Sequence, residues 1–469
     1  MALQFYNTLT KTKQEFTPLQ EGKVMMYNCG PTVYNYATIG NFRSFLLADV
    51  LRRYLEYKGY EVKQIMNLTD VGHMTTDADE GEDKLEKAAR ELKKDPWQLA
   101  EFYAQAFFED IDSLGIVRAH KYPRATEHIP EMIELVQKLI DNGHAYVSGS
   151  SVYYDLSSFP QYGQLSGNTL EKLQAGARVE INPEKRDPHD FALWKSDPHH
   201  IMQWASPWGR GFPGWHLECS AMSMKYLGPT LDIHTGGEDN IFPHHECEIA
   251  QSEGANGVQF VRYWLHTRFL LVEGSKMSKS LGNFYTLRDL REKGYDPLAV
   301  RYLLISTTYR QPLNFTFEAL EAAQETLRRI RDFMLRLNEA QGEGSTPEVA
   351  EAITVARADF EAALDDDLNM SKGLAALFDF THNINRLNLT VQDAQAAAAM
   401  MNGFNKVLGI IEVEREEVLP EEIERLIEER QQARKNKDFR KADEIRDSLH
   451  RRGIVLEDTP HGVRWKQVK

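Results

Sequence analysis

The sequence predicts an α/β fold in which a doubly wound parallel sheet is assembled from two separated halves. Residues 23–27 form a short apolar run typical of a buried strand, 41–59 carry helical periodicity, and 61–67 are again strand-like. The same order of strand, helix and strand returns downstream, at 230–237, 244–254 and 261–274. Because crossovers between parallel strands are right-handed by default, two such units place helices on both faces of one sheet.

The remaining segments differ in composition from these two units. A helical region around 80–142, a hairpin expected at 145–158 and a stretch rich in Pro, Asp and Trp indicate an insertion between the halves. After about residue 310, apolar residues recur at helical spacing, which predicts an α-helical bundle, and β-like runs near the end indicate a small C-terminal domain. We expect the first half of the sheet, the insertion, the second half, the bundle and the C-terminal domain at 1–125, 126–228, 229–310, 311–400 and 401–469.

Composition limits the class of protein and its partners. The 469 residues carry a net charge of −15 and three scattered cysteines, too few for a disulfide framework, so we expect a reducing compartment, the cytoplasm. The start has no leader pattern and no window is apolar enough to span a membrane, so no membrane partner is expected. Nucleic acid would need a local basic face; residues 434–452 are a candidate, although their interleaved acids equally fit a solvated helix.

A loop with two lysines is the most specific motif in the chain. The string K-M-S-K-S at 276–280 follows an apolar strand and carries Lys276 and Lys279 among serines. Two ammonium groups and several hydroxyls suit a polyphosphate, and they lower a barrier most when pyrophosphate departs. A generic Lys/Ser loop would be an ordinary surface feature, but this five-residue string is far more specific than a lone lysine pair.

Cysteine, histidine and glutamate side chains suggest a metal site. Cys29 follows the first strand of the sheet, Cys219 lies on a short helix, and His244 and Glu248 are four residues apart on one helix face. Two thiolates, an imidazole and a carboxylate can hold Zn²⁺. Spacing alone leaves the alternatives open: His245 and Cys247 are rival ligands, and the cysteines can simply be buried.

These motifs, with others in the same order, resemble class I aminoacyl-tRNA synthetases, and among them the cysteinyl-tRNA synthetases. Besides K-M-S-K-S, the resemblance is carried by the strings YNCGPTVYNYATIGN, NLTDVGH, YPRATEHI, GHAYVSGSSVYYD, LQAGARVE, FALWK, GWHLECSAM, LDIHTGGEDNIFPHHECEIAQSE and GIVLEDTPHG. They extend over nearly the whole chain. The resemblance implies a Rossmann-like catalytic core with a connective insertion, a helical bundle and a small anticodon-binding domain.

The resemblance also ranks the metal ligands. Cys29, Cys219, His244 and Glu248 match the zinc-binding positions of the family one by one, whereas we expect His245 to point away from Glu248. One Zn²⁺ per subunit would bind the thiol of the substrate cysteine and reject serine, which an apolar pocket separates by only ~1–3 kcal/mol. No separate editing domain is then needed.

Further site residues follow from the family pattern. The turn at Thr38, Ile39, Gly40 and Asn41 is expected to bind ATP, Lys276 and Lys279 to hold the departing phosphates, and Thr38 and Asn41 to take part in catalysis. His234 and Asp239 are expected at the adenylate, and Thr69 and Trp215 at the amino acid. Two departures stand out: Thr38 and Asn41 replace the histidines of the family's H-I-G-H motif, and Thr235 replaces a common glycine. Thr and Asn still donate hydrogen bonds, and the turn opens a helix that favours anions, but cationic imidazole is lost.

The implied activity is an ATP-dependent ligation, with Mg²⁺ accompanying ATP. Cysteine is joined to AMP with loss of pyrophosphate and then passes to the 2′-hydroxyl of the terminal adenosine of its tRNA, without a covalent enzyme intermediate. We expect a monomer whose helices after residue 310 approach the tRNA from inside its bend. The C-terminal domain would read the anticodon, with Arg464 and Trp465 as candidate contacts.

Two alternatives stay open at this point. One is a ligase that passes activated cysteine to an amino-sugar in mycothiol synthesis, although about 150 residues follow the core here and that family lacks a full anticodon-binding region. The other is an inactive paralogue that binds RNA or a partner, which the T-I-G-N turn favours and the intact K-M-S-K-S string opposes.

Overall fold

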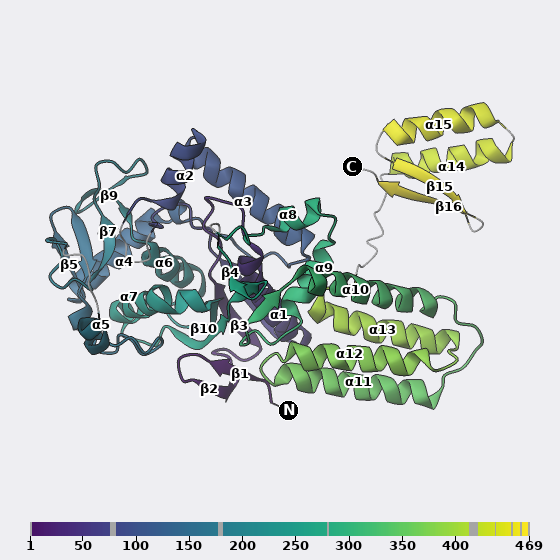
Figure 1. Cartoon of the computed structure of the whole chain (residues 1–469), viewed down its shortest axis with the longest axis horizontal. Coiled ribbons are helices and arrows are strands. Elements are labelled where there is room, and N and C mark those ends of the chain that lie inside the picture. Colours follow the sequence, from purple (N-terminus) through teal and green to yellow (C-terminus); the bar gives the residue numbers. More distant parts are fainter. Residues whose placement is uncertain are drawn as a thin grey trace. The chain divides into compact units, whose positions relative to one another are not determined.

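A computed structural model describes the chain over 2–75, 81–176, 182–278, 281–411, 421–436, 438–451, 454–459 and 462–467. The chain forms two compact units, residues 1–411 and 412–469, each of which is described by itself (Figure 1). Within the described residues, no helix is both long enough and apolar enough to cross a membrane.

A parallel sheet lies at the centre of the first unit, as the sequence predicts. Its strands are β3 (Lys23–Asn28), β4 (Glu61–Met66), β10 (Leu231–Gly237) and β11 (Val261–Thr267). Their order is β11-β10-β3-β4, and every neighbouring pair is parallel. The two halves of the sequence therefore meet between β3 and β10, and ligands of such sheets bind beyond the carboxyl ends of the strands at this switch point.

Helices cover the sheet and position its loops. Helix α1 (Ile39–Tyr57) connects β3 to β4 and is buried along most of its length, because α9 (Pro297–Ile305) and α13 (Val391–Leu408) pack on it. Helices α6 (Trp215–Leu227) and α7 (Glu246–Asn256) pack against each other beside the sheet (Figure 1). The predicted 41–59 helix is thus confirmed with a start two residues earlier.

The insertion contains a small sheet of its own. After α2 (Lys84–Leu92), α3 (Pro96–Ser113) and α4 (Ile129–Asp141), the expected hairpin forms and extends into a five-stranded antiparallel sheet of order β5-β6-β7-β9-β8. The strands are β5 (Ala145–Ser148), β6 (Ser151–Tyr154), β7 (Phe191–Lys195), β8 (Trp204–Ser206) and β9 (Gly209–Pro213). The last three strands are not predicted by the sequence, because their Trp, Gly and Pro interrupt the alternation of apolar and polar residues.

Shorter elements complete the first unit. An N-terminal hairpin, not predicted, pairs β1 with β2, and β12 lies between β13 and β14 in a small separate sheet. These are β1 (Gln4–Asn7), β2 (Thr12–Glu15), β12 (Leu270–Val272), β13 (Ser275–Lys276) and β14 (Leu313–Phe315), so the predicted strand 261–274 is two strands. The short helices are α5 (Leu170–Gly176), α8 (Leu287–Glu292), and turns at Ala125–Glu127, Leu156–Ser158, Glu238–Asn240 and Ile241–His245.

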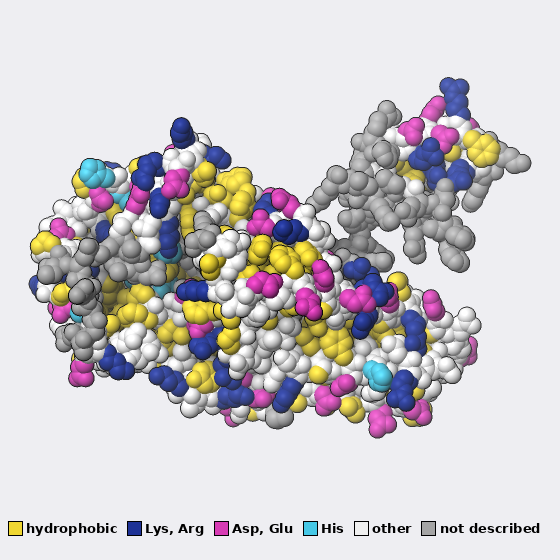
Figure 2. Space-filling view, viewed as in Figure 1, with side chains coloured by type: hydrophobic (Ala, Val, Ile, Leu, Met, Phe, Trp, Pro, Cys, Tyr) yellow, Lys and Arg dark blue, Asp and Glu magenta, His cyan; other side chains and the backbone are white. Residues whose placement is uncertain are grey.

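A helical bundle ends the first unit. It comprises α10 (Phe317–Leu337), α11 (Pro347–Asp365), α12 (Met370–Asn385) and α13. The boundary expected at 400/401 lies inside α13, and the compact unit continues to Ile411. On the face shown in Figure 2, acidic and basic side chains are interspersed over these helices rather than gathered by sign.

The second unit joins a helix pair to a hairpin. Helices α14 (Glu421–Lys435) and α15 (Phe439–Arg451) precede the antiparallel strands β15 (Ile454–Thr459) and β16 (Gly462–Gln467). Ile423, Ile445, Leu449 and Ile454 form its core. The hairpin confirms the β-like runs expected at the end of the chain.

One buried ion pair ties the bundle to the sheet domain. The Arg301 guanidinium is completely buried, lies 2.5 Å from Asp49 Oδ2 on α1, and donates to the Leu408 carbonyl at 2.7 Å and the Leu114 carbonyl at 3.2 Å. Truncating Arg301 would therefore leave a buried carboxylate and two carbonyls with fewer donors.

We predict that Arg301→Met lowers the free energy of unfolding of the first unit by at least about 3 kcal/mol, measured by urea denaturation with far-UV circular dichroism. The exposed Arg329, which pairs with Glu325 at 3.2 Å, gives the matched control Arg329→Met, expected to cost less than about 1 kcal/mol. Equal, small losses in both variants would contradict the role assigned to Arg301.

Candidate functional site

A cleft opens at the carboxyl ends of β3 and β10. Its volume is about 340 Å³, within the range of small-molecule sites. The cleft brings together seven of the residues predicted from the sequence, namely Cys29, Thr38, Gly40, Asn41, Trp215, Asp239 and Lys276. These residues come from distant segments of the chain, and the switch point of the sheet brings them together.

The T-I-G-N turn is the N-terminal cap of α1. The Thr38 hydroxyl accepts from the Asn41 backbone N–H at 3.2 Å, and Asn41 Oδ1 accepts from the Thr38 backbone N–H at 2.9 Å. The same Asn41 oxygen also accepts from the Thr38 hydroxyl at 2.8 Å. This reciprocal capping box satisfies two helix-end donors, so both side chains that replace the motif histidines have a structural role.

The turn is coupled to the lysine loop. The Ile39 N–H donates to the Tyr285 carbonyl at 3.0 Å, and Thr38 pairs with Thr286 in an isolated antiparallel bridge. A Cβ atom on Gly40 would lie 2.9 Å from Met277 Cε. Glycine at this position therefore lets the methionine of K-M-S-K-S pack directly on the first turn of α1.

Asn283 holds the described part of the lysine loop. Its Oδ1 accepts from the Ser278 N–H at 2.8 Å, and its amide donates to the Lys276 carbonyl at 3.2 Å. Lys276 lines the cleft, with its Nζ 5.0 Å from the centre of the Phe269 ring. Lys279 lies outside the described residues, so its expected contact with phosphate stays a prediction.

Four predicted ligand residues converge beside the cleft. One donor atom from each of Cys29, Cys219, His244 and Glu248 lies within 4.8 Å of the other three. Cys29 follows β3 and also lines the cleft, Cys219 lies on α6, and Glu248 lies on α7. His244 Nε2 is 3.1 Å from Glu248 Oε1, yet this buried oxygen has no hydrogen-bond partner. A nitrogen and a carboxylate oxygen this close without hydrogen-bond geometry fit a cation between them, so the donor set suits a metal ion.

Two further histidines orient these groups. His216 Nδ1 contacts His244 Nδ1 at 2.9 Å, which leaves His244 Nε2 directed at Glu248. His234 Nε2 lies 3.0 Å from Glu248 Oε2, the other oxygen of that carboxylate. Such outer partners fix the tautomer and rotation of metal ligands. Burial raises the pKa of the Cys29 thiol to about 11, and the charge of nearby Glu248 adds to the increase.

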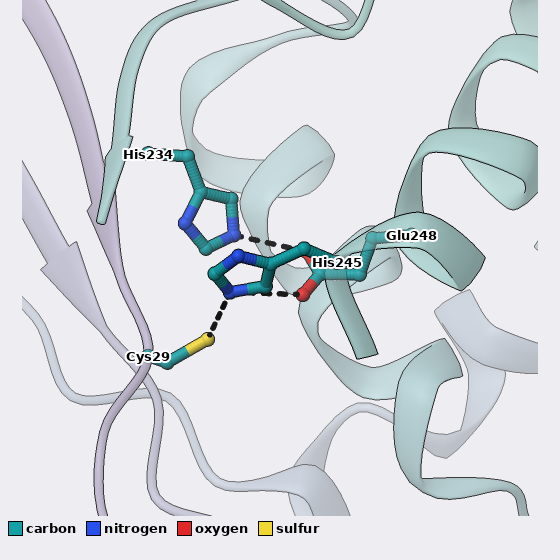
Figure 3. Close-up of side chains that lie close together, drawn as sticks. All are labelled: Cys29, His234, His245 and Glu248. Atoms are coloured by element: carbon teal, nitrogen blue, oxygen red, sulfur yellow. Dashed lines mark hydrogen bonds and ion pairs between the residues drawn. The ribbon is translucent and has the colours of Figure 1, made fainter. Parts of the chain in front are cut away.

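The expectation that His245 points away from Glu248 is wrong. His245 Nε2 is 3.1 Å from Cys29 Sγ and 3.9 Å from Glu248 Oε1, because residues three apart at the start of α7 also share a face. Figure 3 shows the resulting second group, Cys29, His234, His245 and Glu248, whose donor atoms also lie within 4.8 Å of one another. In both groups a second histidine contacts Nδ1 of the histidine next to Glu248: His216 contacts His244 at 2.9 Å, and His266 contacts His245 at 2.7 Å. Each of these contacts leaves Nε2 directed at the cluster, and the first group is preferred because it matches the positions that the family resemblance predicts.

His234 does not line the cleft. It is buried in the cluster, and its ring stacks on Trp264 with 4.7 Å between ring centres. Its expected contact with the adenylate stays a prediction. Thr235, which replaces a common glycine, lies in β10, where its hydroxyl accepts from the Asn28 amide at 2.7 Å. The extended strand accommodates this side chain.

Trp215 lines the cleft, whereas Thr69 is buried away from it. Trp215 begins α6 and lies between His73 and His244, with ring centres 3.8 Å and 4.3 Å away. Thr69 is buried and donates to Glu218 Oε1. A cleft contact by Thr69 is therefore not seen, and its role at the amino acid stays a prediction.

His73 and Lys84 also line the cleft, although neither is predicted from the sequence as a site residue. His73 belongs to the loop that follows β4, and Lys84 is the first residue of α2. The position of this loop was the available signal, because residues just beyond the carboxyl end of a parallel strand lie at the ligand edge of the sheet.

Comparisons with known proteins agree with this geometry. The family described as tRNA synthetases class I (C) catalytic domain matches residues 15–325, the DALR domain matches 359–412, and the cysteinyl-tRNA ligase anticodon binding domain matches 416–465. The cysteine–tRNA ligase of Chlorobaculum tepidum is 46% identical over 491 residues, covering 100% of this chain and 99% of that protein. The chain belongs to the cysteine–tRNA ligase family. The family member of Thermus thermophilus is 45% identical over 481 residues, with 99% of both chains covered.

Solved synthetases share the fold of this family member. Mycobacterium tuberculosis methionyl-tRNA synthetase in complex with methionyl-adenylate superposes with a TM-score of 0.59 at 15% identity, covering 83% of this chain and 90% of that one. The Agrobacterium radiobacter K84 AgnB2 LeuRS in a ternary complex with tRNA and LeuAMS gives 0.60 at 13% identity, covering 84% and 85%. These likenesses confirm the predicted α/β core with added helical parts.

We predict that Gly40→Ala lowers the activity of this family member by on the order of 10- to 100-fold without lowering its melting temperature. Gly40 lines the cleft, so the new Cβ intrudes on the site and forces the Met277 side chain to move, whereas alanine favours a helix by up to about 1 kcal/mol over glycine. The measurement is aminoacylation of tRNA together with thermal unfolding. Gly403→Ala on α13, where a Cβ meets no atom within 4 Å, is the control and should keep full activity; equal activity in both variants would contradict the coupling.

Proposed function

We propose that the protein activates cysteine with ATP as cysteinyl-adenylate and transfers it to the 3′-terminal adenosine of its tRNA. The single observation that carries the proposal is that a Cys/His/Glu donor cluster shares Cys29 with the wall of the cleft, while Thr38, Gly40, Asn41 and Lys276 line the same cleft. Thiol recognition and phosphate recognition thus lie within one small-molecule site. The family relationship over the whole chain supports the same activity.

Selection of cysteine follows from the donor cluster. We assign Cys29, Cys219, His244 and Glu248 as the ligands of one Zn²⁺, with His216 and His234 as the groups that orient them. Bound zinc would supply a Lewis acid that favours a thiolate sulfur over a serine hydroxyl. Trp215, stacked on His244, would cover the apolar side of the substrate.

The residues that would activate ATP lie in the same cleft, around the N-terminus of α1. The N-terminus of α1 offers a favourable site for phosphate, and the Asn41 side-chain N–H groups remain as donors because Oδ1 is used in the capping box. Asp239 lines the cleft where the nucleotide would lie, and Mg²⁺ would accompany ATP. Lys276 and Lys279 would hold the departing pyrophosphate. Their positive charges would lie where negative charge develops in the transition state.

The helical bundle and the second unit would bind the tRNA. The described hairpin β15–β16 includes Arg464 and Trp465 in its second strand, and the match of 416–465 to an anticodon-binding family supports anticodon reading there. This match also favours tRNA over an amino-sugar as acceptor. A monomeric, cytoplasmic enzyme stays our proposal.

The test is pyrophosphate exchange into ATP with cysteine and with serine, using zinc-loaded and chelated protein. We expect exchange only with cysteine, and only in the zinc-loaded protein. Absence of exchange in folded, zinc-loaded protein would overturn the proposal and favour an inactive RNA-binding paralogue.

We predict that Cys219→Ser weakens zinc binding by at least about 100-fold, because loss of a direct ligand costs at least as much as loss of an outer partner. Cys247 gives a matched control: it is also buried, and its sulfur lies 3.4 Å from the Tyr162 hydroxyl. Zinc content by mass spectrometry should be about one ion per chain in wild type and in Cys247→Ser. Loss of zinc from Cys247→Ser and retention in Cys219→Ser would contradict the ligand assignment.

We predict that a chain ending at Ile411 keeps pyrophosphate exchange within about threefold but loses at least about 100-fold in tRNA charging. The shortened chain keeps α13 and the whole compact first unit, which contains the cleft. Parallel measurement of the two activities in the full and shortened chains separates activation from tRNA binding. Equal losses in both activities would contradict this division of labour.

A further inference from the structure

Lys84 occupies a defined place in the wall of the cleft. It is the first residue of α2, whose N-terminus is capped by the Asp83 carboxylate through the Leu85 and Glu86 N–H groups. It lines the same cleft as Thr38 and Asn41, and its Nζ lies 5.8 Å from the centre of the Trp215 ring. The capped helix start therefore holds a lysine beside the side chain that covers the amino acid.

His73 contacts this lysine through both its backbone and its side chain. Its carbonyl accepts from the Lys84 backbone N–H at 2.8 Å, and its Nε2 lies 2.5 Å from Lys84 Nζ. On the other side of the ring, Nδ1 contacts the Thr32 hydroxyl at 2.6 Å, and the ring stacks on Trp215 with an interplanar angle of 10°. Burial lowers the pKa of His73 well below its usual range, with the Lys84 charge adding to the effect, so the imidazole is neutral. A neutral ring can accept from the ammonium at Nε2 while it donates to Thr32 at Nδ1.

Few of the described side chains that line the cleft carry positive charge. The described cations that line it are Lys84, Arg268 and Lys276. Arg268 donates to Glu238 Oε2 at 2.6 Å, so its charge is largely balanced by a carboxylate. Lys276 lies on the loop that would hold pyrophosphate, and T-I-G-N contributes only neutral side chains.

The junction between amino acid and nucleotide lies between the two ends of the cleft. Cys29 and Trp215 mark the thiol end, and Thr38 and Asn41 mark the phosphate end. A substrate whose sulfur meets the donor cluster must direct its carboxylate toward the α-phosphate of ATP. Lys84 Nζ lies beside Trp215 at the amino-acid end, so its charge is near the carboxylate that must approach the α-phosphate, and a cation there reduces the repulsion between the two anionic groups.

We propose that Lys84 is a further catalytic residue, whose ammonium binds the cysteine carboxylate and the α-phosphate as the adenylate forms, and that His73 is its positioning residue. In this step a carboxylate oxygen forms a bond to the α-phosphorus, and the bond from that phosphorus to the bridging oxygen of the β-phosphate breaks. Pyrophosphate leaves with the electron pair, and Lys84 keeps its proton throughout. The ammonium supplies charge that the imidazoles of H-I-G-H would otherwise provide. This inference rests on the proposed function.

The test compares Lys84→Met with Lys87→Met in pyrophosphate exchange. Methionine keeps the apolar stem and removes the charge, and Lys87 is an exposed lysine on the same helix that does not line the cleft. We expect Lys84→Met to lower kcat by on the order of 10²–10³-fold with zinc content and melting temperature unchanged, the usual loss for one transition-state donor. Lys87→Met should stay within about twofold, and Lys84→Arg should recover part of the rate.

His73 is tested by a pair of variants. His73→Gln keeps a polar acceptor and should retain more of the rate than His73→Leu, and Lys84→Met should cost less in the His73→Leu background than in wild type, because the two residues act as a unit. If the wild type shows exchange and Lys84→Met exchanges at a rate within about threefold of it, the role of Lys84 is overturned while the proposed function stands. Absence of cysteine-dependent exchange in wild type would instead overturn the proposed function.

Discussion

The convergence of donor atoms at the switch point of the parallel sheet is the constraint on which the rest of the site depends. Strand β3 ends in Cys29 beside β10, and α6 and α7 bring Cys219, His244 and Glu248 to the same place. Such a group of buried acids and thiols is costly without a cation. Here His216 and His234 hold the donor residues in place. Cys29 connects the cluster to the cleft.

The T-I-G-N turn shows how one short segment serves both structure and chemistry. Thr38 and Asn41 use their oxygens to cap α1, and Gly40 gives room to Met277 of the lysine loop. The turn thereby fixes the phosphate end of the cleft through geometry rather than charge. Charge must then come from residues outside the motif, and Lys84, which contacts His73, lines the same cleft. The replacement of two histidines is consistent with a redistribution of roles rather than with loss of a site.

Sequence reasoning predicted those parts that local pattern decides. Apolar runs predicted β3 and β4, helical spacing predicted α1 and α10, and family motifs named the four donors that lie together. The rest depends on contacts between distant segments. His245 is held in the cluster by its contact with Cys29, more than two hundred residues away, and β7–β9 of the insertion are stabilised by pairing rather than by alternation. The packing of His234 on Tyr27 and the approach of Lys84 to Trp215 likewise join segments more than a hundred residues apart, which no local pattern records.

Binding of the substrate sulfur to zinc in the donor cluster can be measured by zinc K-edge X-ray absorption. Spectra of the zinc-loaded protein would be recorded alone, with cysteine and with serine. We predict that cysteine adds one sulfur ligand at about 2.3 Å and that serine leaves the spectrum unchanged. An unchanged sulfur count in the presence of saturating cysteine would contradict this mode of substrate binding.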